Sequence, residues 1–137
     1  MERSDFQRLA RTRLQEAKVL LENNCFDGAY YLAGYAVECA LKACIAKQTQ
    51  RHEFPDKTRV LDSYTHDFAK LLKAANLTTA LKKELKTNSV FRNNWQIVER
   101  WSEEARYQTV TSQTAIALYA AIADRQERVL SWFKKFW

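Results

Sequence analysis

The sequence predicts an all-α fold, an antiparallel up-and-down bundle of four to five helices in which residues 1–137 form a single domain. The chain has only two glycines and one proline, whereas sheet-rich folds need many turns built from these residue types. Residues of high helix propensity are abundant, and apolar residues recur at helical spacing along several segments. Hydrophobic residues make up 47% of the chain, which is enough for one core and argues against intrinsic disorder.

The first helix is predicted to start at Ser4, because Ser4 and Gln7 have the spacing of a capping box. It should end at Asn23 and Asn24. Its inward face is predicted to consist of Phe6, Ala10, Leu14, Ala17 and Leu21.

The second helix is predicted from about Asp27 to Lys47, with Asp27 as its N-cap or as an acid in its first turn. One face carries small residues that let a neighbouring helix approach closely: Ala29, Ala33, Ala36, Val37, Ala40, Leu41 and Cys44. A second stripe differs in chemistry and consists of Tyr31, Gly34, Tyr35, Glu38 and Lys42. Glu38 and Lys42 are spaced i,i+4, so they are predicted to pair, either on the surface or partly buried.

Residues 48–64 contain Pro55 and few apolar positions, and they are predicted to form the one long loop. Thr65 is predicted to cap the next helix, with Asp67 in its first turn. The inward residues of this helix are Phe68, Leu71 and Leu72.

Two further short helices and a longer last helix complete the prediction. The short ones run from about Thr78 to Lys86 and from about Ser89 to Trp101, the second with Val90, Trp95 and Val98 as its apolar positions. Residues 102–110 connect to one last helix that begins near Thr111. Its apolar positions are Ala115, Leu118, Tyr119, Ile122, Val129, Trp132, Phe133 and Phe136.

The net charge of +6 favours polyanionic partners such as RNA, DNA or nucleotides, although solubility alone also explains it. The three cysteines form no zinc-binding pattern, and Cys39 and Cys44 are predicted as small core residues. No apolar run approaches the ~20 residues of a membrane span, and the polar N-terminus is unlike a secretory leader. We therefore expect a cytoplasmic protein without a metal or cofactor.

Residues 26–43 carry paired tyrosines, small residues, and Ala-Val-Glu followed closely by Ala-Leu-Lys-Ala. Two shorter elements follow, Thr65-His66-Asp67-Phe68 and Ala105-Arg106-Tyr107. Together these elements resemble the HEPN (higher eukaryotes and prokaryotes nucleotide-binding) domain family over nearly the whole chain. The resemblance implies a four- or five-helix bundle that is often dimeric. It also implies one of two functions, an RNA-cleaving toxin or defence nuclease, or a non-catalytic binding partner that is often paired with a minimal nucleotidyltransferase.

For the nuclease branch, the resemblance implies an Arg followed, after four to six residues, by a His late in the bundle. No His follows Arg106, since His66 is the last histidine of the chain. Arg59 and His66 have six residues between them, but they lie in the middle of the chain. In an RNase, His66 would move a proton while Arg59 or Arg106 stabilised the phosphorane charge.

The ligand-binding candidates are Tyr31, Tyr35, Glu38, Lys42, His66, Arg106 and Tyr107. Arg106 offers a guanidinium to phosphate and Tyr107 a ring to a base, unless both pack on the bundle at a helix start. His66 either lies on the surface or faces a pocket beside Tyr31, Glu38 or Arg106. The four tryptophans can stack bases, but aromatic residues at helical spacing more often fill a core or interface.

The leading prediction is a non-catalytic, dimeric, HEPN-like module that binds a nucleotide, RNA or a nucleotidyltransferase partner. One alternative is a metal-independent RNase toxin of a toxin-antitoxin or defence system. Another is a purely structural protein-interaction domain. The leading prediction requires Tyr31, Glu38 and Arg106 to border one polar recess.

Overall fold

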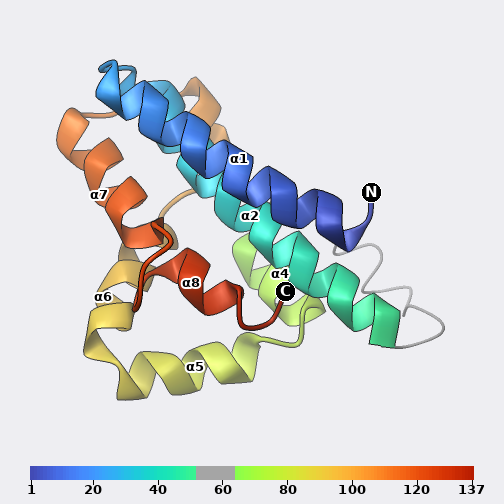
Figure 1. The fold of residues 1–137 in the computed structure, drawn as a ribbon. Helices are drawn as coiled ribbons and strands as arrows, with labels where there is room; N and C mark the ends of the chain where they lie inside the picture. Colours follow the sequence, from blue (N-terminus) through green and yellow to red (C-terminus); the bar gives the residue numbers. More distant parts are fainter. Residues whose placement is uncertain (52–63) are drawn as a thin grey trace.

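The computed structural model describes residues 1–51 and 64–137, and this part of the chain is a bundle of packed helices without a strand (Figure 1). The all-α prediction is thus confirmed. In chain order the elements are α1 (Arg3–Glu22), α2 (Phe26–Arg51), α4 (Phe68–Ala74), α5 (Thr78–Thr87), α6 (Ser89–Val98), the 3-10 helix η1 (Glu103–Tyr107), α7 (Ser112–Ile122) and α8 (Val129–Phe133).

Helices α1 and α2 lie side by side and run in opposite directions, α7 packs against both, and α4, α6 and α8 lie below (Figure 1). Small residues make this close packing possible. Ala10 and Ala17 of α1 and Ala33, Ala36 and Ala40 of α2 are all completely buried. The predicted small-residue face of the second helix is therefore the face that packs in the core.

The start of α1 differs from the prediction. Glu2 is the residue before the helix, and its main-chain N–H donates to Asp5 Oδ2 at 2.9 Å. The predicted capping box of Ser4 and Gln7 is therefore wrong, because Ser4 already lies inside the helix. The Gln7 side chain instead donates to the main-chain oxygen of Trp137 at 2.8 Å, and so connects the two ends of the chain.

Helix α2 starts one residue earlier than predicted and extends further. Asp27 lies in its first turn, and Asp27 Oδ1 accepts a hydrogen bond from the Val110 N–H at 2.8 Å. This bond ties the start of α2 to the segment before α7. The helix continues to Arg51, so the first part of the loop predicted for 48–64 is helical. Most of that predicted loop, with Pro55, lies outside the described residues.

Asp67, and not Thr65, caps α4. Asp67 Oδ1 accepts from the N–H groups of Ala69 at 2.8 Å and Lys70 at 3.3 Å, as an N-cap does. Thr65 Oγ1 accepts from the Asp67 N–H at 3.2 Å instead. The two polar residues together fix the path of the chain into α4, next to His66.

Helix α6 is shorter than predicted, because it ends at Val98 instead of Trp101. Val90 is one of the three apolar positions predicted for this helix, but it is 48% exposed. Phe91, Trp95 and Val98 take the inner face at helical spacing, which leaves Val90 on the outer side of the first turn.

The predicted last helix is two helices. The chain leaves helical geometry after α7 at Ala123, where ψ is 149°, and Glu127 has a φ of 68°. Asn94 Nδ2 of α6 donates to the Glu127 carbonyl at 2.8 Å and so holds this turn. The break turns α8 so that Trp132 and Phe133 are buried in the core.

The core is rich in aromatic side chains. All four tryptophans are buried, so they fill the core as predicted and do not form an exposed stacking surface. Phe91 and Phe133 are almost completely buried beside them. Within the described residues, no helix combines the length and the apolar composition needed to cross a bilayer.

The three cysteines should differ sharply in reactivity. Burial raises the pKa of the Cys39 and Cys44 thiols to about 12, whereas Cys25 is exposed. Because the thiolate is the reacting species, a disulfide reagent at pH 8 should label Cys25 rapidly and the other two only after denaturation. The time course over which the reagent releases its own thiol measures the labelling rate of each class of cysteine. A Cys25→Ser variant should lose the rapid phase, and rapid labelling that persisted in it would contradict the burial of Cys39 and Cys44.

Candidate functional site

The site is built on Glu38, a buried carboxylate on the second stripe of α2. Its side chain is 1% exposed, and each of its oxygens has a partner. Lys42 Nζ lies 3.2 Å from Oε2, and His66 Nδ1 lies 2.9 Å from Oε1. A buried carboxylate needs such partners to offset its lost hydration. Of the two predictions for the Glu38–Lys42 pair, the partly buried one is therefore correct.

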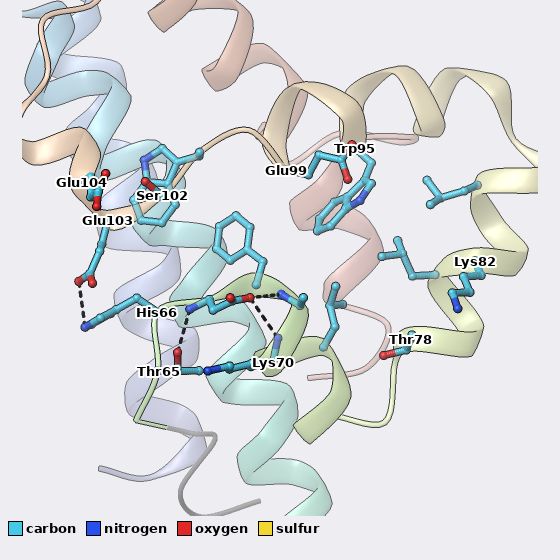
Figure 2. A pocket seen from close by; sticks show the side chains of 17 residues that line it. Thr65, His66, Lys70, Thr78, Lys82, Trp95, Glu99, Ser102, Glu103 and Glu104 are labelled. Carbon is cyan, nitrogen blue, oxygen red and sulfur yellow. Dashed lines mark hydrogen bonds and ion pairs between the residues drawn. The ribbon is translucent and has the colours of Figure 1, made fainter.

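His66 continues this contact chain toward the surface. Its Nε2 lies 3.2 Å from Glu103 Oε2 at the start of η1, a contact drawn in Figure 2. The same Glu103 oxygen lies 3.6 Å from Arg106 Nη2. The side chains of His66 and Glu103 are 42% and 40% exposed, so the contacts lead from the buried Glu38 to the solvated Arg106.

Both ring nitrogens of His66 face carboxylate oxygens. Nδ1 lies 2.9 Å from Glu38 Oε1 and Nε2 lies 3.2 Å from Glu103 Oε2, so each ring nitrogen is within hydrogen-bond distance of an acceptor. A general base needs a ring nitrogen that faces the RNA hydroxyl instead. The geometry suits a histidine that joins α2 to η1 and holds them in place.

Tyr31 and Tyr35 lie in an aromatic stack. Their ring centres are 6.0 Å apart, and Tyr31 also stacks on Trp101 at 6.1 Å. Trp101 stacks in turn on Phe68 of α4, at 5.3 Å and an angle of 15°. Burial, with smaller contributions from Cys39 and Glu38, raises the pKa of Tyr35. The stack connects these tyrosines to Phe68, which lies two residues from His66 in the sequence. Tyr31 and Tyr35 do not line the groove described below.

Gly34 explains how Trp101 reaches this stack. The Trp101 ring packs directly against the Gly34 backbone, where a Cβ would lie less than 3.0 Å from three ring atoms. The indole Nε1 of Trp101 is buried without a hydrogen-bond partner among the described residues. The sequence placed Gly34 on the correct stripe, but no local signal identified Trp101 as its neighbour.

Arg106 and Tyr107 form an exposed edge at the end of η1. The Arg106 guanidinium carbon lies 5.2 Å from the centre of the Tyr107 ring, and Tyr107 is 81% exposed. The alternative that both residues pack on the bundle is therefore wrong. Glu103 was not predicted at this site, although its i,i+3 spacing from Arg106 was a usable signal.

A groove of about 870 Å³ opens beside this contact chain (Figure 2). It lies between α4, α5, the end of α6 and the start of η1, and His66 and Glu103 border one side of it. Its apolar residues are Phe68, Leu72, Leu81, Leu85, Trp95 and Trp101. The sequence predicted a polar recess bordered by Tyr31, Glu38 and Arg106, but none of these three residues lines this groove, so the prediction is wrong for it. The lining comes instead from several separate segments, which helical periodicity does not bring together.

The candidate residues thus fall into connected groups. Glu38, Lys42, His66 and Arg106 belong to one contact chain, and Tyr31 reaches the neighbourhood through the aromatic stack. Arg59 lies outside the described residues, so the structure contains only the histidine of the predicted Arg59–His66 pair.

Comparison with known proteins gives one result. The family model described as HEPN domain matches residues 4–136, which is nearly the whole chain. No match was found among curated proteins or among solved structures.

Proposed function

Because the chain belongs to the HEPN domain family, which gives it a nucleotide- or RNA-related function, we propose that it binds a nucleotide or a segment of RNA without cleaving it. The binding edge in this proposal is Arg106 and Tyr107. The observation that carries the proposal is that an exposed guanidinium and an exposed ring lie together, at the end of a contact chain in which His66 is held by two carboxylates.

The chemistry of the edge supports ligand binding. Arg106 can donate two parallel hydrogen bonds to a phosphate, and the open face of Tyr107 can stack on a base. Stacking on an aromatic side chain contributes about 1–3 kcal/mol per base. Glu103 lies beside Arg106 and repels phosphate, so we expect moderate affinity that falls as the salt concentration rises.

The position of the His66 ring supports the absence of cleavage. Its two nitrogens lie 2.9 and 3.2 Å from carboxylate oxygens of Glu38 and Glu103. A general base would need a free nitrogen within hydrogen-bond distance of the RNA 2′-hydroxyl. In addition, the sequence contains no histidine after Arg106, where the nuclease branch would require one.

Titration of the protein with labelled oligo-uridine, ATP and GTP, followed by fluorescence anisotropy, tests the binding edge. We expect saturable binding to at least one of them, weakened about tenfold or more by Arg106→Ala and by Tyr107→Ala, because the phosphate contact or the stack is lost. Arg8→Ala, which removes an exposed arginine on α1, is the matched control and should leave the affinity unchanged. Binding that is absent, or that Arg106→Ala leaves unchanged, would favour the purely structural alternative.

A cleavage assay with the same RNA completes the experiment. The expected product pattern is identical with and without protein. Cleavage that disappears in His66→Ala would assign the chain to the nuclease branch and overturn the proposal. Pairing with a second copy, or with a minimal nucleotidyltransferase, stays a prediction of the family resemblance.

A further inference from the structure

The groove beside the contact chain has walls of opposite charge. Glu99 at the end of α6 and Glu103 and Glu104 in η1 supply the acidic side, and Lys70 of α4 with Thr78 and Lys82 of α5 supply the other side (Figure 2). The whole chain carries a net charge of +6, so a wall with three carboxylates is a local exception. His66 lies between Glu103 and Glu38 and contacts a carboxylate of each.

The helix ends strengthen this polarity. Helix α6 ends at Val98 with Glu99 as its C-cap, so its partial negative charge adds to the acidic wall. Helix α5 begins at Thr78, so its partial positive charge adds to Lys82 on the opposite wall. Each helix has 10 residues, long enough for the backbone dipoles to reinforce the side-chain charges.

The charges on the two walls are available to a partner. Glu99, Glu104 and Lys82 form no ion pair with any residue in the described part of the chain. Asp67, by contrast, is occupied in capping α4, and Glu103 is held by His66 and Arg106. A bound cation beside Glu99 and Glu104 would therefore displace no ion-pair partner from the described part of the chain.

The shape of the groove decides between classes of ligand. The groove is partly open to solvent, whereas small-molecule sites enclose about 70–90% of their ligand. A nucleic-acid strand would place phosphates against the acidic wall, where the carboxylates repel them. A short linear peptide segment avoids both difficulties, because it can lay apolar side chains on the floor and continue beyond the groove.

We propose that this groove docks a linear segment of a partner protein, with Lys or Arg against Glu99 and Glu104, apolar side chains over Trp95 and Leu81, and an acidic residue against Lys82. The segment therefore has a fixed direction across the groove. Arg106 and Tyr107 do not line the groove, although Glu103 lines it and contacts Arg106, so the two sites are neighbours. The domain thus has one surface for its nucleotide or RNA and another for a protein.

Calorimetric titration with a synthetic peptide, acetyl-Arg-Arg-Leu-Leu-Leu-Asp-amide, tests the proposal. We expect saturable binding, with NMR amide shifts confined to α4, α5, α6 and η1. The double variant Glu99→Lys with Glu104→Lys should weaken binding about tenfold or more, because the arginines lose their partners. The control double variant, Glu22→Lys with Glu127→Lys, changes the net charge equally at two exposed acids outside the groove and should bind normally.

A charge exchange tests the direction of the segment. Lys82→Glu should weaken binding of the peptide about tenfold, and a peptide ending in Arg instead of Asp should restore it. Circular dichroism of each variant verifies that the helices are intact. The proposal is overturned by the absence of saturable binding, by equal weakening in both double variants, or by a swapped peptide that gives no recovery. Oligo-uridine producing the same amide shifts would assign the groove to RNA and would also overturn it.

Discussion

Replacing Gly34 by alanine is expected to lower the free energy of unfolding by about 3 kcal/mol, the upper end of the usual cost of overpacking a core. The added Cβ would lie less than 3.0 Å from Cδ2, Cε2 and Nε1 of Trp101. The indole cannot easily move aside, because it is buried and stacks on Phe68 and Tyr31. Helix α2 and the segment at Trp101 must therefore separate.

Gly28→Ala is the matched control, since it makes the same substitution in the same helix. A Cβ at Gly28 would meet only Leu20 Cδ1, at 3.2 Å, and this atom is the end of a flexible side chain. Alanine has a helix propensity about 1 kcal/mol more favourable than that of glycine. We expect Gly28→Ala to leave stability unchanged or to raise it by up to about 1 kcal/mol, opposite in sign to Gly34→Ala.

Urea unfolding followed by far-UV circular dichroism measures both variants. If Gly34→Ala stabilises the protein as Gly28→Ala should, then Trp101 does not pack on α2 as described. A double-mutant cycle gives a second test. Trp101→Leu removes the ring that the new methyl group would meet, so Gly34→Ala should cost much less in that background than in the unmodified protein.

The two faces of α2 could be predicted from the sequence, because helical periodicity is a local property. Residues three and four apart share a face wherever the helix lies in the fold. The small-residue face is indeed buried, Tyr31 stacks on Tyr35, and Glu38 pairs with Lys42. Each of these contacts depends only on spacing within one helix.

The contacts that assemble the site join distant parts of the chain, and periodicity carries no information about them. Glu38 and His66 are separated by 28 positions, and Gly34 meets Trp101 from another segment. The break in the predicted last helix has the same origin. Residues 123–128 contain no glycine or proline, and the turn there is held by Asn94 of α6.

The errors in the predicted N-caps of α1 and α4 are smaller than the missed break in the last helix, and they have a local cause. In each case two polar residues lie two positions apart, Glu2 and Ser4 for α1, and Thr65 and Asp67 for α4. Either member of such a pair can bond to the free N–H groups of a first turn. Propensity alone therefore locates the cap only to within one or two residues.

Removing the buried carboxylate should have an effect similar in size to that of overpacking the core. Glu38→Ala is expected to lower the free energy of unfolding by about 3 kcal/mol, because it leaves Lys42 and His66 without their shared acceptor and opens a cavity. We place the value at the lower end of the range for a broken buried pair, since Lys42 and His66 are 17% and 42% exposed and can partly recover hydration.

Two further variants show which property of the Glu38 side chain matters. Glu38→Gln removes the charge but keeps the volume, whereas Glu103→Ala removes a carboxylate that is partly exposed. Glutamine keeps the size and one acceptor for His66, but its NH2 group faces Lys42 Nζ, so about half of the loss should remain. Glu103 is 40% exposed, and its removal should cost under about 1 kcal/mol. Urea unfolding measures all three variants. Equal stability losses for Glu38→Ala and Glu103→Ala would contradict a site anchored on a buried carboxylate.

The same variants separate stability from ligand binding. If the contact chain positions the edge, then Glu103→Ala, which barely affects folding, should still alter the affinity at Arg106 and Tyr107, because Arg106 loses the carboxylate that holds it. The change has two opposing parts. A freer guanidinium costs more entropy to order, but the removal of a negative charge favours phosphate. A fall in affinity would mean that positioning dominates, and a rise would mean that charge dominates. An unchanged affinity for both Glu103→Ala and Glu38→Gln would show that the chain from Glu38 to Arg106 maintains the fold alone.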